Sequence, residues 1–173
     1  MRSQRGASLL ELLAMLAVAG IAVTLSVIGS LGWIHRQASR SAVYHVQAML
    51  QAARSEAVAR NRACQLRVEP GTRTLRIVDL NLAGSSDDVR ISATELSRTT
   101  QFDRPDSGDA VDLPLFATGV HEATFEADGT VSSGAGGEIV LRGGDDYYRI
   151  TLYGAGGVRV ERWDHNGWSG SLR

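Results

Sequence analysis

The feature that most constrains the fold is a run of 23 uncharged residues from Leu12 to Ile34. In an α-helix this run measures about 35 Å, and the hydrocarbon core of a bilayer is about 30 Å thick. The run is too long and too uniformly apolar for an ordinary buried helix, so it predicts a membrane span. Trp33 near its end, with His35 and Arg36 beyond, is typical of a span that stops at a membrane interface.

An acidic residue, Glu11, directly precedes this run. A carboxylate at the edge of an apolar span is costly and by default indicates a function. Two interpretations follow from the residues alone. Either Glu11 ends the span at the interface, or it lies in the apolar region and requires a cationic partner.

The residues around Glu11 form a motif. The stretch Arg5–Leu12 (RGASLLEL) resembles the class III leader junction of type IV pilins and type II secretion pseudopilins. The resemblance implies that an inner-membrane prepilin peptidase cuts after Gly6 and methylates the new amino terminus, Ala7. Glu11 is then the fifth mature residue, as in the family, and assembly would pair it with the amine of its own or a neighbouring subunit. The family usually has phenylalanine where this chain has Ala7.

Two other interpretations of the amino terminus remain open. A secretory signal peptide also has a basic start and an apolar run, and AVAG (residues 17–20) offers a cleavage site. A plain single-span anchor explains the apolar length as well. Neither accounts for the spacing from Gly6 to Glu11, which therefore favours the pilin-like interpretation.

The chain after the apolar run predicts a continuation of the same helix. Glycine and proline are absent between Trp33 and Glu69, and helix-forming residues are abundant. Apolar residues recur every three or four positions and draw one face of a helix: Val43, Val46, Leu50, Ala53 and Ala57. One helix from Ser8 to Asn61 is therefore expected, with an amphipathic second half.

The pattern changes near Cys64. Segments with alternating or β-branched residues and glycine-rich turns predict antiparallel strands, whereas residues 99–114 are polar and are expected to be irregular. The predicted fold class is α+β, a pilin-like fold in which a long N-terminal helix, with a transmembrane half and an amphipathic half, packs on a C-terminal antiparallel β-domain. The expected divisions are a leader peptide (1–6), the transmembrane half (7–34), the amphipathic periplasmic half (35–62) and a β-rich pseudopilin domain (63–173).

The last 50 or so residues carry a second resemblance. The order FEADGTV, EIVLRGG and YYRITLYGAGGVRVERW is similar to the carboxy-terminal region of the GspH/FimT group. In that group the last strand has the form Gly-Arg-Val-Arg. Here Val158 follows Gly157, so the first arginine of the pattern is missing.

The sequence offers no pattern of catalytic or metal-binding residues. The four histidines are scattered, and a single cysteine, Cys64, excludes an internal disulfide and fits a small buried residue. Acidic pairs at Asp87–Asp88 and Asp145–Asp146 leave calcium open, although solvated turns are favoured. We therefore expect no cofactor, no metal and no enzymatic activity.

Nucleic acid is a less favoured partner. The tail carries Arg159 and Arg162 near two tryptophans, a combination that can hold phosphates and stack bases. Some minor pilins of the FimT type take part in DNA uptake. However, Glu161 and Asp164 dilute the patch, and the formal net charge of the chain is −1.

The two resemblances together imply a minor pseudopilin of the type II protein secretion system. Such a subunit lies in the bacterial inner membrane with a single span and a periplasmic C-terminal domain, and it assembles into the pseudopilus that drives protein export. Its expected partners are prepilin peptidase, other pseudopilins or pilins and the inner membrane. The alternative is a FimT/FimU-like minor pilin in type IV pilus biogenesis.

Overall fold

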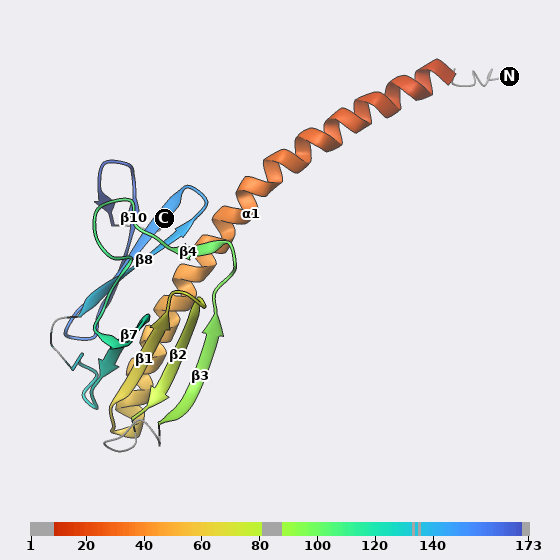
Figure 1. Ribbon diagram of the computed structural model, residues 1–173. Helices are drawn as coiled ribbons and strands as arrows, with labels where there is room; N and C mark the ends of the chain where they lie inside the picture. Colours follow the sequence, from red (N-terminus) through yellow and green to blue (C-terminus); the bar gives the residue numbers. More distant parts are fainter. Residues whose placement is uncertain (1–8, 81–87, 133, 135, 171–173) are drawn as a thin grey trace. The chain divides into compact units, whose positions relative to one another are not determined.

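The computed structural model describes residues 9–80, 88–132, 134 and 136–170, without the side chains of residues 10, 24–36 and 38. It contains a long helix, α1 (Leu9–Arg60), followed by strands (Figure 1). The chain divides into two compact units, Met1–His35 and Arg36–Arg173. We call the second unit the head.

The first unit contains the amino-terminal part of α1. Its leucines and alanines favour helix, and Glu11 in the first turn suits the positive end of the helix dipole. The large apolar side chains described here are all exposed: Leu9, Leu12, Leu13, Met15, Leu16, Val18, Ile21 and Val23. Within the part of the chain that the structure describes, no helix is long and apolar enough to cross a membrane. The expected span, Leu12–Ile34, includes side chains that lie outside that part.

In the head, α1 buries the face that the sequence predicted. The five apolar residues from Val43 to Ala57 that step by three and four are at most 1% exposed, which confirms the prediction. The helix ends in a Schellman motif. Asn61 adopts a left-handed φ of 51°, its N–H donates to the Val58 carbonyl, and the Arg62 N–H donates to the Ala57 carbonyl.

Two antiparallel sheets follow the helix. The first sheet has the order β3-β2-β1-β7-β6. Its strands are β1 (Cys64–Glu69), β2 (Thr74–Asp79), β3 (Val89–Glu95), β6 (Leu115–Ala117) and β7 (Val120–Phe125). Figure 1 shows β1, β2 and β3 beside the last turns of α1. The predicted turn at Pro70–Gly71 joins β1 to β2, and the Arg73 N–H donates to the Pro70 carbonyl.

The second sheet has the order β11-β10-β9-β8-β4, and β5 also pairs with β8. Its strands are β4 (Thr100–Phe102), β5 (Val111–Asp112), β8 (Gly137–Gly143), β9 (Asp146–Leu152), β10 (Val158–Trp163) and β11 (Trp168–Ser169). The expectation that residues 99–114 are irregular is wrong for β4 and β5. These strands are two or three residues long, too short to show a period in the sequence.

One hydrophobic core joins the helix to both sheets. It contains Leu50 from α1, Leu66 and Phe125 from the first sheet, and Ile139 and Tyr148 from the second. The helix and β8 approach closely, because a Cβ placed on Gly143 would lie 2.1 Å from the Cβ of buried Ser39. The predicted α+β head with antiparallel sheets is thus confirmed.

Candidate functional site

The sites predicted at the amino terminus are described only in part. Gly6 and Ala7, the residues of the expected peptidase junction, lie outside the described residues. Glu11 lies in the first turn of α1, and its side chain is exposed between exposed leucines. Its carboxylate is therefore accessible to a group from another molecule.

The two arginines predicted as nucleic-acid contacts are not brought together. Arg159 and Arg162 both lie on β10, but successive strand residues alternate between faces, so an odd separation places them on opposite faces of the sheet. Each is paired with a carboxylate. Arg159 Nη2 lies 2.9 Å from Glu161 Oε1, and Arg162 Nη2 lies 2.7 Å from Asp146 Oδ1.

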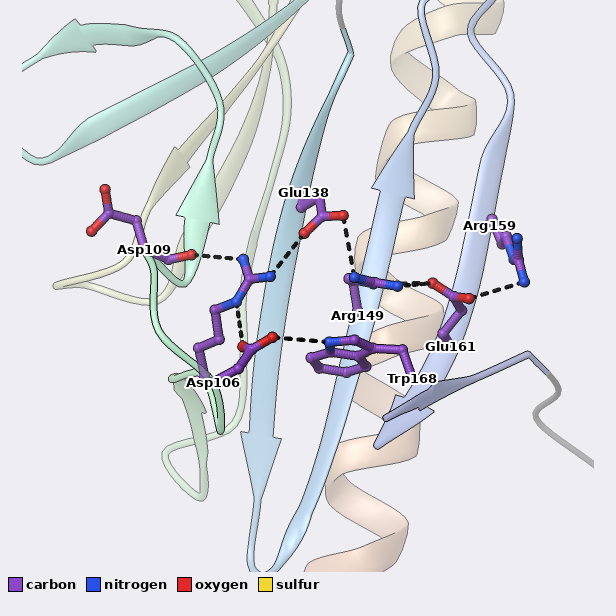
Figure 2. Close-up of polar contacts among 8 residues, drawn as sticks. Asp106, Asp109, Glu138, Arg149, Arg159, Glu161 and Trp168 are labelled. Atoms are coloured by element: carbon purple, nitrogen blue, oxygen red, sulfur yellow. Dashed lines mark hydrogen bonds and ion pairs between the residues drawn. The ribbon is translucent and has the colours of Figure 1, made fainter. Parts of the chain in front are cut away.

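Arg159 ends a row of alternating charges across the outer face of the second sheet, which we call the charge ladder (Figure 2). It comprises Arg104, Glu138, Arg149, Glu161 and Arg159. Glu138 lies 3.2 Å from Arg104 and 3.5 Å from Arg149. Glu161, which is 6% exposed, lies 2.6 Å from Arg149. Each inner member thus contacts opposite charges on both sides, an arrangement in which ordering one side chain serves two pairs.

The other end of the ladder is closed by a carboxylate and an indole. Asp106 lies 2.5 Å from Arg104 and accepts a hydrogen bond of 3.2 Å from the Trp168 indole N–H. The hydrogen bond from Arg104 is the main cause that lowers the pKa of Asp106. The Arg149 guanidinium lies 4.7 Å from the centre of the Trp168 ring, a cation–π contact. Trp168 also meets Trp163 edge to face at 5.2 Å.

The ladder and its closing carboxylate carry three positive and three negative charges. A neutral set of this kind offers little field to attract phosphates. Its ion pairs, with the contacts of Trp168, connect the segment after β4 and the strand β11 to the central strands of the sheet, which is a structural role.

The ladder was not predicted from the sequence. Arg159 and Arg162 were named only as possible nucleic-acid contacts, and the ion-pair partners across the sheet depend on the strand register. Glu161 faces Arg149 across β9 and β10, and that pairing becomes visible only when the register is known. Arg104 lies in the segment that the sequence predicted to be irregular.

Two of the four acidic residues considered for calcium, Asp88 and Asp146, are paired with arginines. Asp88 pairs with Arg67 at 2.6 Å and Asp146 with Arg162, while Asp87 lies outside the described residues. No three His, Cys, Asp or Glu side chains gather as a metal site in the described part of the chain. Cys64 is fully buried, as predicted, and burial raises the pKa of its thiol.

The core and most of the ladder fall within a region that matches a known family. A family model described as "Type II transport protein GspH" matches residues 42–156, about two thirds of the chain. The chain belongs to the GspH family. The match covers Arg104, Glu138 and Arg149, whereas the GspH-family region ends before Arg159 and Glu161.

The fold of this GspH-family protein is similar to that of a solved structure. The type IV minor pilin FimU of Pseudomonas aeruginosa is similar with a TM-score of 0.56 and 21% identity, over 80% of this chain and 97% of that one. The minor pseudopilin EpsH of the type II secretion system of Vibrio cholerae is similar with a TM-score of 0.48 and 17% identity, over 71% and 94% of the two chains. No curated protein sequence matches the chain.

Proposed function

We propose that this protein is a minor pseudopilin of the type II protein secretion system, a structural subunit of the periplasmic pseudopilus that drives protein export. The observation that carries the proposal is the match of residues 42–156 to the GspH family, whose description names type II transport.

In this proposal prepilin peptidase cuts after Gly6 and methylates Ala7, and the helix that includes Leu12–Ile34 anchors the subunit in the inner membrane. The exposed leucines of the first unit support an apolar environment, because a large uncovered apolar surface marks a site of interaction with protein or lipid. The mature chain then places its head in the periplasm.

Glu11 is the proposed assembly residue. A protonated amine and a carboxylate each cost several kcal/mol alone in lipid, and much less as a pair. Pairing Glu11 with the terminal amine of a neighbouring subunit therefore favours ordered addition to the pseudopilus.

Intact mass of the protein extracted from membranes tests the processing step. In cells with an active prepilin peptidase, the mass is expected to lack MRSQRG and to carry one added methyl group. Cells without the peptidase supply the control. Retention of the six residues in peptidase-active cells would contradict the proposal.

The assembly step is tested with Glu11→Ala, which is expected to be cleaved normally but to enter the pseudopilus poorly. Glu56→Ala is a matched control, because Glu56 also lies on α1 but pairs with Arg60 of its own chain at 2.7 Å. Normal incorporation of Glu11→Ala would show that the charge pair is not required.

A second candidate is a minor pilin that acts in type IV pilus biogenesis, favoured by the fold similarity to FimU over nearly the whole of that structure. Deletion of the gene separates the two candidates. Loss of exoproteins from the medium with normal pili supports the pseudopilin, whereas loss of pili with normal secretion supports the pilin.

DNA binding at Arg159 and Arg162 belongs to that second candidate. The pairing of both arginines with carboxylates leaves little net positive charge for phosphates. Gel shifts at low salt test it, with Arg159→Ala and Arg162→Ala beside the unchanged chain. A shift that the substitutions abolish would establish the contact, and no shift would remove it.

A further inference from the structure

The loop between β10 and β11 contains an asparagine followed by a glycine, Asn166–Gly167. The chain has two other asparagines, Asn61 and Asn81, which precede an arginine and a leucine. The side-chain amide of asparagine can be attacked by the backbone nitrogen of the next residue. Glycine leaves that nitrogen least hindered, because it has no side chain. The pair is therefore a candidate site of covalent modification.

Both groups that would react are accessible. Asn166 is exposed, and its side-chain amide has no hydrogen-bond partner among the described residues. A Cβ placed on Gly167 would meet nothing within 4 Å, so there is open space beside the backbone at that position. The Asn166 side chain can therefore rotate toward the Gly167 nitrogen without breaking a hydrogen bond.

A carboxylate contacts the nitrogen that would attack. The Gly167 N–H donates a hydrogen bond of 2.9 Å to Asp164 Oδ1, and the Asn166 N–H donates one of 3.0 Å to the same oxygen. The Asp164 N–H in turn donates to the Gly167 carbonyl at 3.1 Å, which closes the loop. Asp164 is thus held where it can accept the proton that the Gly167 nitrogen loses.

Asn61 supplies a contrast within the same chain. It is also exposed, but the N–H of the next residue, Arg62, donates to the Ala57 carbonyl at 3.1 Å in the motif that ends α1. A backbone carbonyl is a much weaker base than a carboxylate, and the arginine side chain crowds the nitrogen. Asn61 is therefore an accessible asparagine without a neighbouring base and without a following glycine.

We propose that Asn166 undergoes deamidation through a cyclic imide, with Asp164 as the base. The Gly167 nitrogen forms a bond to Asn166 Cγ while its proton passes to Asp164. The bond from Cγ to Nδ2 then breaks, and the nitrogen leaves as ammonia with that proton. Water adds to one of the two carbonyls of the imide and opens the ring. The products are aspartate and isoaspartate, in which the main chain runs through the former side chain.

The modification would change the connection between β10 and β11. Both products add a negative charge, and isoaspartate also adds one carbon to the main chain of a loop of four residues, 164–167. Because β11 begins directly after this loop, the longer loop is expected to displace Trp168 from Asp106 and Arg149 (Figure 2). Asn166 would then determine how firmly one end of the charge ladder is closed.

Mass spectrometry of the full chain, stored in detergent at neutral pH, tests the site. A protease that cleaves after glutamate releases Asn61 and Asn166 in one digest, as the peptides 57–69 and 162–173. Relative to a sample digested at once, Asn166 is expected to convert at least about tenfold faster than Asn61 and to give both products. Equal rates at the two asparagines, or no conversion at Asn166, would overturn the inference.

Two changes at Asp164 separate a base from a restraint on the loop. Asp164→Asn retains an oxygen that can accept the Gly167 N–H but loses the basic carboxylate, and Asp164→Ala loses both. Each is expected to slow conversion of Asn166 about tenfold or more. Asp145→Ala is the control, because Asp145 is an exposed carboxylate in the β8–β9 turn. An unchanged rate in Asp164→Asn, a faster rate in Asp164→Ala, or an equal loss in Asp145→Ala would overturn the role of Asp164.

Tryptophan fluorescence during storage tests the effect on Trp168. In the unchanged chain the signal is expected to change in step with conversion of Asn166. In Asn166→Gln it should stay constant, because the longer side chain closes a ring much more slowly. A constant signal in the unchanged chain after conversion would show that β11 keeps its contacts. These measurements do not depend on the proposed function, since the residues involved all lie in the head.

Discussion

Two stretches of α1, one in the first unit and one in the head, differ in how far their apolar side chains are buried. Leu16 in the first unit is 69% exposed, whereas Leu50 in the head is 1% exposed. Both stretches are rich in helix formers, so helix propensity does not distinguish them. The head supplies partners for one face of the helix from its own sheets. The large apolar side chains of the first stretch have no such cover among the described residues of the chain.

The largest effect on stability is expected when the same leucine-to-alanine change is made in each of the two stretches. Leu50→Ala removes a buried side chain and is expected to lower the free energy of unfolding of the head by about 2–5 kcal/mol. Leu16→Ala is expected to leave it unchanged. Urea unfolding of the full chain in detergent, followed by circular dichroism, measures both. Equal effects would mean that the two stretches share one folding unit.

Gly143 tests how tightly the helix is held in the head. Gly143→Ala forces a Cβ to within 2.1 Å of the Ser39 Cβ, and the repacking is expected to cost about 1–3 kcal/mol. Gly71→Ala is the control, since nothing lies within 4 Å of a Cβ there. The same unfolding experiment compares them. An unchanged free energy of unfolding for Gly143→Ala would show that the helix can shift relative to β8 at little cost.

The charge ladder tests whether the head also satisfies its charges internally. Glu161→Ala removes the carboxylate shared by Arg149 and Arg159, and is expected to destabilise the head by about 1–2 kcal/mol. Asp103→Ala, which breaks a pair with Arg142 whose side chains are 42% and 40% exposed, is expected to cost less than about 0.5 kcal/mol. A similar loss of stability in the two variants would show that the ladder contributes no more than ordinary surface ion pairs.

The smallest expected effect is a pH dependence at Glu122. Burial raises the pKa of this carboxyl, with Arg67 opposing, so the folded head holds the proton more tightly than the unfolded chain does. Stability from this group is therefore present at low pH and is lost as the pH rises from its ordinary pKa, 4.5, through the raised one. Glu122→Gln should flatten that decline in urea midpoints. An unchanged slope would assign the decline to other groups.

Much of the head was predictable because its signals are periodic. Val43 to Ala57 repeat at helical spacing, and strands such as β1 and β2 alternate around a Pro-Gly turn. The left-handed Asn61 that ends α1 was not predicted, although asparagine commonly adopts this conformation.

What the sequence did not reveal depends on contacts between distant segments. The Trp168 indole reaches Asp106 across 62 positions, and Glu161 meets Arg149 only in the observed register. Arg159 and Arg162 lie on opposite faces because they are three positions apart on one strand. This could have been predicted once a strand was expected there. The amino-terminal motif is the reverse case, because a sequence pattern identifies Gly6 and Ala7 while the structure describes neither.

The close approach of Gly143 to Ser39 has an evolutionary consequence. Two backbones that meet without space for a pair of ordinary side chains cannot change independently. Among related proteins, the two positions are expected to covary in size, so that a lineage with a side chain at the strand position has glycine at the helix position. Positions 39 and 143 would then record, in sequences alone, how near this helix lies to its sheet.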